Sequence, residues 1–169
     1  MNPLPLVVGV VAVLRLLELV HAARNARALR ARGAVEHGAS HYPLFILLHG
    51  SWLLSLLVLV PWDAAVVWPF LALVIALQFF RLWVIWSLGP AWTTRVITLP
   101  DEKLVRRGPY RWLNHPNYLV VAAEIAALPL AFGAWRIALV FSLLNAAMLA
   151  WRIGVEDRAL SAELSPRSR

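Results

Sequence analysis

The sequence contains no cysteine, which excludes disulfide bonds, thiolate metal sites and thiol chemistry. Acidic residues are few: the chain has 9 Asp and Glu but 16 Lys and Arg, which gives a formal net charge of +7. No basic region precedes the first apolar run and no small-residue cleavage site follows it, so we expect no cleaved signal peptide. The basic residues flank apolar runs, a pattern that favours contact with anionic lipid headgroups over nucleic-acid binding.

Polar residues are scarce as well, because 61% of the chain is hydrophobic and the mean hydropathy is +0.69. Soluble domains contain about 45–50% apolar residues, so lipid must solvate much of this protein. Runs of about 20 apolar residues predict transmembrane helices. We therefore predict an all-α polytopic integral membrane protein in which residues 1–169 form one domain with five spans, at about 4–20, 42–60, 64–88, 118–132 and 135–153.

Basic residues are concentrated on one side of this predicted arrangement. The turns at 61–63 and 132–135 are short, whereas the segments 21–41 and 89–117 are long and carry most of the Arg and Lys residues. Positively charged loops tend to stay in the cytoplasm. The sequence therefore predicts a cytoplasmic C-terminus and an N-terminus outside.

Several charged residues fall within or at the ends of the apolar runs, where a side chain that faces lipid is costly and a functional role is the first hypothesis. They are Arg15, Glu18, Arg81, Glu124, Arg152 and Glu156. Arg15 and Glu18 are three residues apart and can pair on one helix face. Arg152 and Glu156 are four apart, at the end of the fifth span. For both pairs, a purely structural ion pair remains the alternative.

The segment 104–118, LVRRGPYRWLNHPNY, is too polar to span a membrane and too rich in turn formers to be one helix. Gly108 and Pro109 predict a turn, and Pro116 restricts His115 to an extended conformation. Irregular backbone at a membrane boundary is tolerated where it lines a cavity or binds a ligand. Aromatic residues of this segment offer flat surfaces for an adenine ring, although the same residue types form belts at the lipid interface. They are Tyr110, Trp112 and Tyr118.

The motif GPYR at 108–111 followed by HPNY at 115–118 resembles the signature of the isoprenylcysteine carboxyl methyltransferase family, which is similar to the phospholipid N-methyltransferases. The family's late motif R-x-x-x-E-E-x-x-L is matched by Arg152, Glu156, Asp157 and Leu160. The N-terminal half resembles a bacterial branch of the same family, with matches that include Arg15, Glu18, Asn25, Glu36, His41 and His49. The resemblance therefore covers nearly the whole chain.

Three positions depart from the family pattern. Asn114 stands where the family has an Arg before His-Pro, Val120 replaces a common Gly, and Asp157 replaces the second Glu. The first change removes a positive charge near the expected cofactor site, whereas the other two are compatible with the pattern.

The resemblance implies S-adenosylmethionine as the cofactor, bound by a loop at about 98–118 and by the end of the fifth helix. The residues that it implies for cofactor binding are Leu104, Val105, Gly108, Tyr110, His115, Pro116, Tyr118 and Glu156. Those that it implies for catalysis are Arg152, Glu156 and His115. For the acceptor pocket we predict Arg81, His49, Glu124 and Arg152.

The predicted reaction is methyl transfer to an oxygen of a lipophilic acceptor, a carboxylate, phenol or enol, amid membrane lipids. The resemblance to the bacterial branch implies long-chain alkylpyrones or alkylresorcinols, and the Ala-, Leu- and Arg-rich composition suits a bacterial inner membrane. A phospholipid N-methyltransferase, a sterol-type reductase that uses NADPH and a non-enzymatic subunit remain alternatives. The 5 His residues lack the close helical pairing of a metal motif, so no metal site is predicted. The sequence predicts no oligomeric state.

Overall fold

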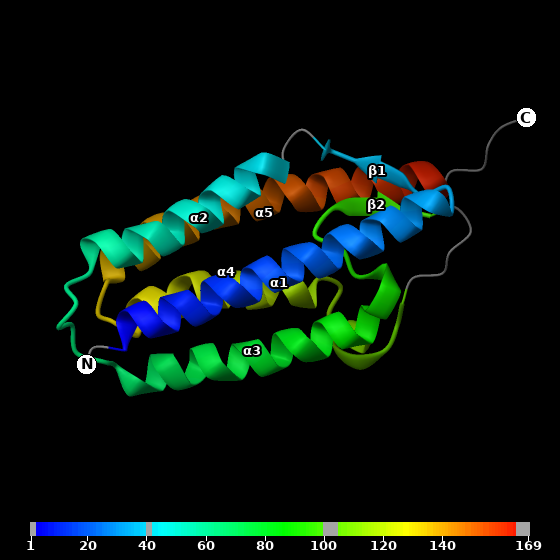
Figure 1. The fold of residues 1–169 in the computed structure, drawn as a ribbon. Helices are drawn as coiled ribbons and strands as arrows, with labels where there is room; N and C mark the ends of the chain where they lie inside the picture. The colour runs from blue at the N-terminus through cyan, green and yellow to red at the C-terminus, as the bar shows by residue number, and fades with distance from the viewer. Residues whose placement is uncertain (1–2, 40–41, 100–104, 165–169) are drawn as a thin grey trace, which may run out of the picture.

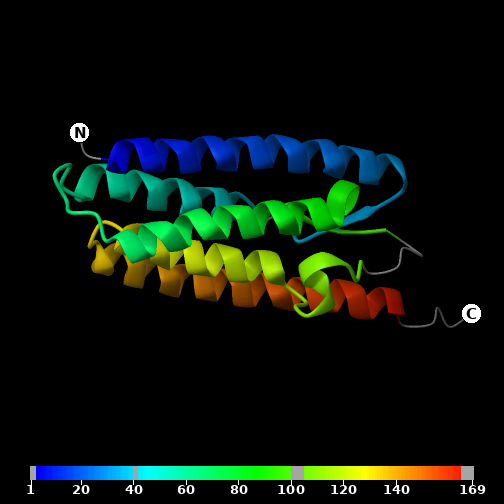
Figure 2. The same cartoon turned by 90° about the horizontal axis from the view of Figure 1, so that it is seen from below.

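The computed structural model describes residues 3–39, 42–99 and 105–164, and side chains as far as Ala159. Its helices are α1 (Leu4–Ala31), α2 (Tyr42–Leu59), α3 (Trp68–Leu88), α4 (Pro116–Leu130) and α5 (Trp135–Leu164). They lie lengthwise in one elongated bundle, with α1 on one side and α4 and α5 on the other (Figure 1, Figure 2). Four of the described helices are long and apolar enough to cross a membrane, and α4 is a shorter apolar helix. The predicted helical, polytopic membrane fold is confirmed.

The helix boundaries differ from the predicted spans in two respects. The third helix begins at Trp68, four residues later than predicted, because Pro69 starts it and Val67 is non-helical. The Val67 N–H instead donates to the Ala131 carbonyl at 2.9 Å, which ties this linker to the end of α4. Helices α1 and α5 run well past the predicted spans, and their 28 and 30 residues correspond to about 42 and 45 Å. Both exceed the roughly 30 Å of a hydrocarbon core, so they extend beyond it.

The tightest packing lies at the end of the bundle where α1 begins. Buried apolar side chains from four helices meet there: Leu4, Val8, Trp52, Leu56, Leu71, Val74, Ile125 and Leu128. Outward faces carry large apolar side chains such as Leu17, Val58 and Phe79, which are 61–69% exposed. Such a surface suits lipid rather than water. This end of the bundle therefore holds the apolar core and the two short connections, at 60–67 and 131–134, whereas the longer segments after α1 and α3 lie at the other end.

Two short strands at the opposite end of the bundle were not predicted. Strands β1 (Val35–His37) and β2 (Val96–Thr98) pair antiparallel, with Glu36 opposite Ile97. They join the segment after α1 to the segment after α3, next to the last turns of α5 (Figure 1). The His37 ring and the Thr98 hydroxyl share a hydrogen bond of 2.8 Å across the pair. Strand β2 forms part of the wall of the candidate site, and β1 pairs with it.

Candidate active site

A cavity of about 550 Å³, the loop cavity, lies at the end of the bundle that carries the strand pair. Its lining comes from residues 88–99, from residues 105–118 and from the last turns of α5. The volume falls within the usual range of small-molecule and cofactor sites. The segment predicted to bind the cofactor and the end of the fifth helix thus enclose a common space.

A hydrogen-bonded chain at the wall of the loop cavity joins α4 to α5. The Tyr118 hydroxyl donates to Glu156 Oε2 at 2.6 Å, and Arg152 Nε donates to the same hydroxyl oxygen at 2.7 Å. The His115 ring stacks on Tyr118 with centroids 5.0 Å apart and an interplanar angle of 8°. His115 Nδ1 lies 3.8 Å from Glu156 Oε2, too far for a hydrogen bond. The motif residues that are distant in sequence therefore share one set of contacts.

Arg152 is buried between two aromatic rings. Its guanidinium carbon lies 5.3 Å from the centre of the Phe45 ring and 5.5 Å from that of Tyr118. Both distances are within the range of cation–π attraction. These two contacts and the hydrogen bond from Nε orient the side chain, and within the described residues its terminal nitrogens have no hydrogen-bond partner.

Tyr110 contributes a neutral hydroxyl to the loop cavity. Burial raises the pKa of its phenol well above the ordinary value, and the negative charge of Glu156 adds to the effect. Like an ordinary tyrosine hydroxyl, it is protonated at physiological pH and can donate a hydrogen bond.

The shape of the loop depends on Gly108, which begins the short 3-10 helix η3 (Gly108–Arg111) with φ of +56°. A Cβ at this position would lie 2.0 Å from the Ser87 Oγ of α3. The neighbouring Arg107 Nε donates to the Ser87 carbonyl at 2.6 Å. The loop is therefore pressed directly against the end of α3.

The predicted cofactor residues occupy different places around this cavity. Its lining includes Val105, Tyr110, His115, Tyr118 and Glu156. Two others lie outside the lining: Gly108 packs against α3, and Pro116 is buried as the first residue of α4. Leu104 lies outside the described residues.

A second cavity, of about 310 Å³ and mostly apolar, lies between α1, α2, α4 and α5; we call it the apolar cavity. Of the predicted acceptor residues, Arg81, His49 and Arg152 line it, whereas Glu124 is buried behind Arg81. The His49 Nδ1–H donates to the Phe45 carbonyl at 2.8 Å. Four residues belong to the lining of both cavities: Trp92, Asn117, Tyr118 and Arg152. The two spaces therefore share a wall, and Tyr118 and Arg152 belong to it.

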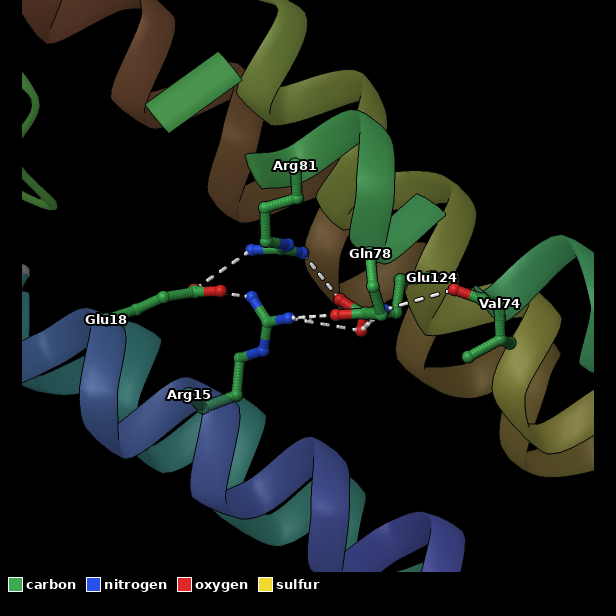
Figure 3. A network of polar contacts seen from close by, with 6 residues as sticks. All are labelled: Arg15, Glu18, Val74, Gln78, Arg81 and Glu124. Atoms are coloured by element: carbon green, nitrogen blue, oxygen red, sulfur yellow. Dashed lines mark hydrogen bonds and ion pairs between the residues drawn. The ribbon is translucent and has the colours of Figure 1, made fainter. Parts of the chain in front are cut away.

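A buried ionic cluster borders the apolar cavity (Figure 3). Arg15 binds Glu18 at 2.5 Å, which is the pairing predicted from their spacing. Arg81 binds Glu124 at 2.5 Å and lies 3.4 Å from Glu18, while Gln78 Nε2 donates to Glu124 at 2.8 Å. Two positive and two negative side chains from α1, α3 and α4 thus compensate one another inside the bundle, as charges within a membrane must.

The structure adds candidate residues that the sequence analysis missed. Asn117 lines both cavities, and its buried Oδ1 has no hydrogen-bond partner within the described structure. Its position inside the HPNY motif is a signal that could have pointed to it. Arg95 and Trp92 also line the loop cavity, but only the strand pair and η2 (Gly89–Ala91) place them there. In the part of the chain that is described, no three His, Asp or Glu side chains are close enough together to hold a metal ion.

Comparison with known proteins identifies the family. Residues 70–162, which include both motifs and the loop between α3 and α4, match the profile of the isoprenylcysteine carboxyl methyltransferase (ICMT) family. The chain belongs to this family. The resemblance inferred from the HPNY and late Arg/Glu motifs is thereby confirmed.

Relatives extend the similarity of this ICMT family member beyond the matched region. The chain is 38% identical over 159 residues to the uncharacterized protein YpbQ of Bacillus subtilis (strain 168), which covers 92% of this chain and 95% of that protein. It is 28% identical over 153 residues to an uncharacterized protein of Haemophilus influenzae, covering 86% and 87% of the two chains. No solved structure matches the chain significantly.

Proposed function

We propose that this protein is an S-adenosylmethionine-dependent methyltransferase that transfers a methyl group to an oxygen of a lipophilic acceptor. The observation that carries the proposal is the wall shared by the two cavities. A partly polar cavity suited to a cofactor and an apolar cavity suited to a lipid meet at Tyr118 and Arg152. An enzyme that joins a water-soluble donor to a membrane-dissolved acceptor needs such an arrangement.

The residues of the loop cavity fit S-adenosylmethionine. Glu156 and Asp157 supply negative charge for its cationic groups, and the aromatic rings of Tyr110 and Trp112 supply flat surfaces for its adenine. The Tyr110 hydroxyl can donate a hydrogen bond to adenosine oxygens or nitrogens. A nicotinamide dinucleotide would need further contacts for its extra phosphates, so the loop suits the sulfonium cofactor better.

The apolar cavity supports a lipid acceptor that enters sideways from the bilayer. Leu16 of α1 and Ile46 of α2 both line this cavity, and both are also exposed on the outer surface, at 62% and 47%. The space therefore reaches the lipid-facing surface between the two helices. An acyl or prenyl chain can lie there while the reacting oxygen is held at the shared wall.

When bound, S-adenosylmethionine supplies a methyl group that is already activated on a positively charged sulfur. The protein has mainly to align the acceptor and exclude water. Arg152 binds Tyr118 through Nε, and its terminal nitrogens stabilise the negative charge of an oxygen nucleophile by charge-assisted contacts. Tyr118 fixes the position of Arg152, and His115 is the candidate base for the proton of a phenol or enol.

We further propose that the loop cavity faces the cytoplasm of a bacterial cell and that the membrane is the inner one. The proposal rests on the basic residues Arg24, Arg27, Arg106, Arg107 and Arg111, which lie near this end of the bundle. Cofactor synthesised in the cytoplasm would then reach the cavity directly.

The first test is ligand binding by the protein purified in detergent, measured by calorimetric titration. We expect binding of S-adenosylhomocysteine and none of NADPH, and at least several-fold weaker binding by Glu156→Gln and His115→Ala. Asp63→Asn is the matched control, because it removes one acidic charge from the linker between α2 and α3 and should bind like the wild type. Binding of NADPH alone would favour the reductase, and binding of neither ligand a structural subunit.

The second test identifies the acceptor. Cells that express the protein receive methionine with an isotopically labelled methyl group, and their lipids are analysed by mass spectrometry. A label on an oxygen of one lipid class is the expected result. A label on the amine of phosphatidylethanolamine would instead establish the N-methyltransferase alternative.

A further inference from the structure

Arg95, between η2 and β2, has no role in the function proposed above, although its side chain lines the loop cavity. The side chain is held from two directions. Glu36 of β1 accepts a hydrogen bond from Arg95 Nη1, and the Arg95 guanidinium carbon lies 4.1 Å from the centre of the Tyr42 ring. About a third of the side chain, 32%, remains exposed. Arg95 is therefore oriented by its neighbours and still accessible to a ligand.

Glu36 is ionised and binds two arginines at once. Burial on its own would raise the pKa of this carboxyl, but hydrogen bonds from Arg95 and Arg30 outweigh it and lower the pKa below the ordinary value. Among the described residues, two guanidinium groups therefore share one carboxylate, which leaves a net positive charge. The register of the strand pair places Glu36 opposite Ile97, which is two residues along from Arg95.

The charges around the loop cavity differ from wall to wall. The α5 wall presents Glu156 and Asp157, whereas the wall before β2 presents Arg95. Two more arginines of the lining, Arg106 and Arg111, are exposed side chains of the loop 105–118. A ligand with a cationic and an anionic group, such as the amino-acid part of S-adenosylmethionine, matches this pattern. Arg152 also lines the cavity, but it is bound to Tyr118 at the wall next to the acceptor.

Arg95 also lies close to the wall that the two cavities share. Tyr42, on which it stacks, lines the apolar cavity, and the Tyr42 hydroxyl shares a hydrogen bond of 3.1 Å with the hydroxyl of Thr94, which lines the same cavity. In S-adenosylmethionine only three carbon atoms, by its covalent structure, separate the sulfur from the carboxylate. If the reactive methyl points at the shared wall, the carboxylate must be bound near that wall.

We propose, on the basis of the function proposed above, that Arg95 binds the carboxylate of the cofactor's amino-acid part. Glu36 and Tyr42 act as positioning residues for it. A guanidinium group presents parallel N–H donors that match the two oxygens of a carboxylate. The strand pair then contributes to the cofactor site, because the pairing of β1 with β2 places Glu36 within hydrogen-bonding distance of Arg95.

The test compares two ligands that differ in the amino-acid part. S-adenosylhomocysteine has it, whereas 5′-methylthioadenosine has the same adenosine and a thioether but no carboxylate or amine. We expect Arg95→Met to weaken S-adenosylhomocysteine binding about tenfold or more, as for the loss of a charge-assisted contact, and methylthioadenosine binding less than about twofold. Arg95→Lys keeps the charge and should lie between. Arg24→Met removes an exposed arginine of α1 that lies outside the lining of both cavities, and it should change the binding of neither ligand.

Glu36→Gln tests the positioning role. It should weaken S-adenosylhomocysteine binding a few-fold and leave methylthioadenosine binding unchanged. The affinity for S-adenosylhomocysteine relative to that for methylthioadenosine should therefore fall, whereas general damage to the fold would weaken both ligands alike. Equal weakening of both ligands by Arg95→Met, or no weakening of S-adenosylhomocysteine, overturns the inference while the cofactor site itself stands. If the wild type bound neither ligand, both the proposed function and the role proposed for Arg95 would be refuted.

Discussion

Gly108→Ala is the substitution whose effect follows most directly from the structure. Two costs add. An L-residue at φ of +56° loses about 1–2 kcal/mol relative to glycine, and a methyl group 2.0 Å from Ser87 Oγ and 2.9 Å from Ser87 Cβ forces the loop off α3. Overpacking of this kind costs about 1–3 kcal/mol. The expected loss in free energy of unfolding is therefore about 2–5 kcal/mol.

Gly133→Ala is the matched control, because Gly133 also has a positive φ, +70°, but no atom lies within 4 Å of the position of its Cβ. It should lose only the backbone part, about 1–2 kcal/mol. The double variant Gly108→Ala with Ser87→Gly removes the overlap with Ser87 and should return toward the level of Gly133→Ala. Each variant is compared by thermal unfolding in detergent, with Ser87→Gly alone as reference.

The same displacement should disturb the cofactor site, since η3 carries Tyr110 into the loop cavity. We expect the Kd of Gly108→Ala for S-adenosylhomocysteine to rise at least about tenfold, which corresponds to about 1.4 kcal/mol, and that of Gly133→Ala to stay near the wild-type value. If Gly108→Ala were no less stable than Gly133→Ala and bound the ligand normally, the close approach of the loop to α3 would be refuted.

Three further substitutions test other contacts. Tyr118→Phe removes the hydroxyl between Arg152 and Glu156, and hydrogen bonds to charged groups contribute about 1.5–3 kcal/mol each. Titration with S-adenosylhomocysteine should therefore give a Kd at least about tenfold higher. An unchanged Kd would contradict the assignment of Tyr118 to the cofactor site. Glu124→Leu leaves Arg81 buried without its closest partner and should cost about 3–5 kcal/mol in thermal unfolding, whereas a loss below about 1 kcal/mol would show that the cluster is dispensable. Glu36 has a lowered pKa, so the stability that it contributes is present above its ordinary pKa of 4.5 and is lost as pH falls through the lower folded value. The Tm difference between wild type and Glu36→Gln should therefore shrink from pH 7 toward pH 4, and a constant difference would refute the ionic role.

Much of the fold could be predicted because membrane spans depend on local composition. The apolar runs predicted α2 to within a residue of its bounds, and the spacing of Arg15 and Glu18 predicted their ion pair. The prediction placed the start of α3 too early because Ala64–Val67 is apolar but not helical. Hydropathy indicates whether a segment suits a lipid environment, but it does not indicate whether its backbone is helical.

The candidate site could be predicted only in part. The motifs predicted Tyr118, Arg152 and Glu156 as members of one site, and the structure brings them within hydrogen-bonding distance. Their roles in binding and catalysis stay predictions. Gly108 was predicted as a cofactor contact, whereas its close approach to Ser87 gives it a role in packing the loop. A motif indicates that a residue matters without indicating which neighbour it contacts.

By itself, then, the sequence determined that lipid solvates this chain, roughly where its helices lie and which short motifs mark its family. Each of these depends on residues that are near one another along the chain. Only the tertiary structure decided that the loop and apolar cavities share a wall at Tyr118 and Arg152, and that Glu36 meets Arg95 through the strand pair. Glu36 and Arg95 are 59 residues apart, and no periodicity or local propensity encodes such a contact. It forms because α1 and α3 bring two loops to the same end of the bundle, where opposite charges pair.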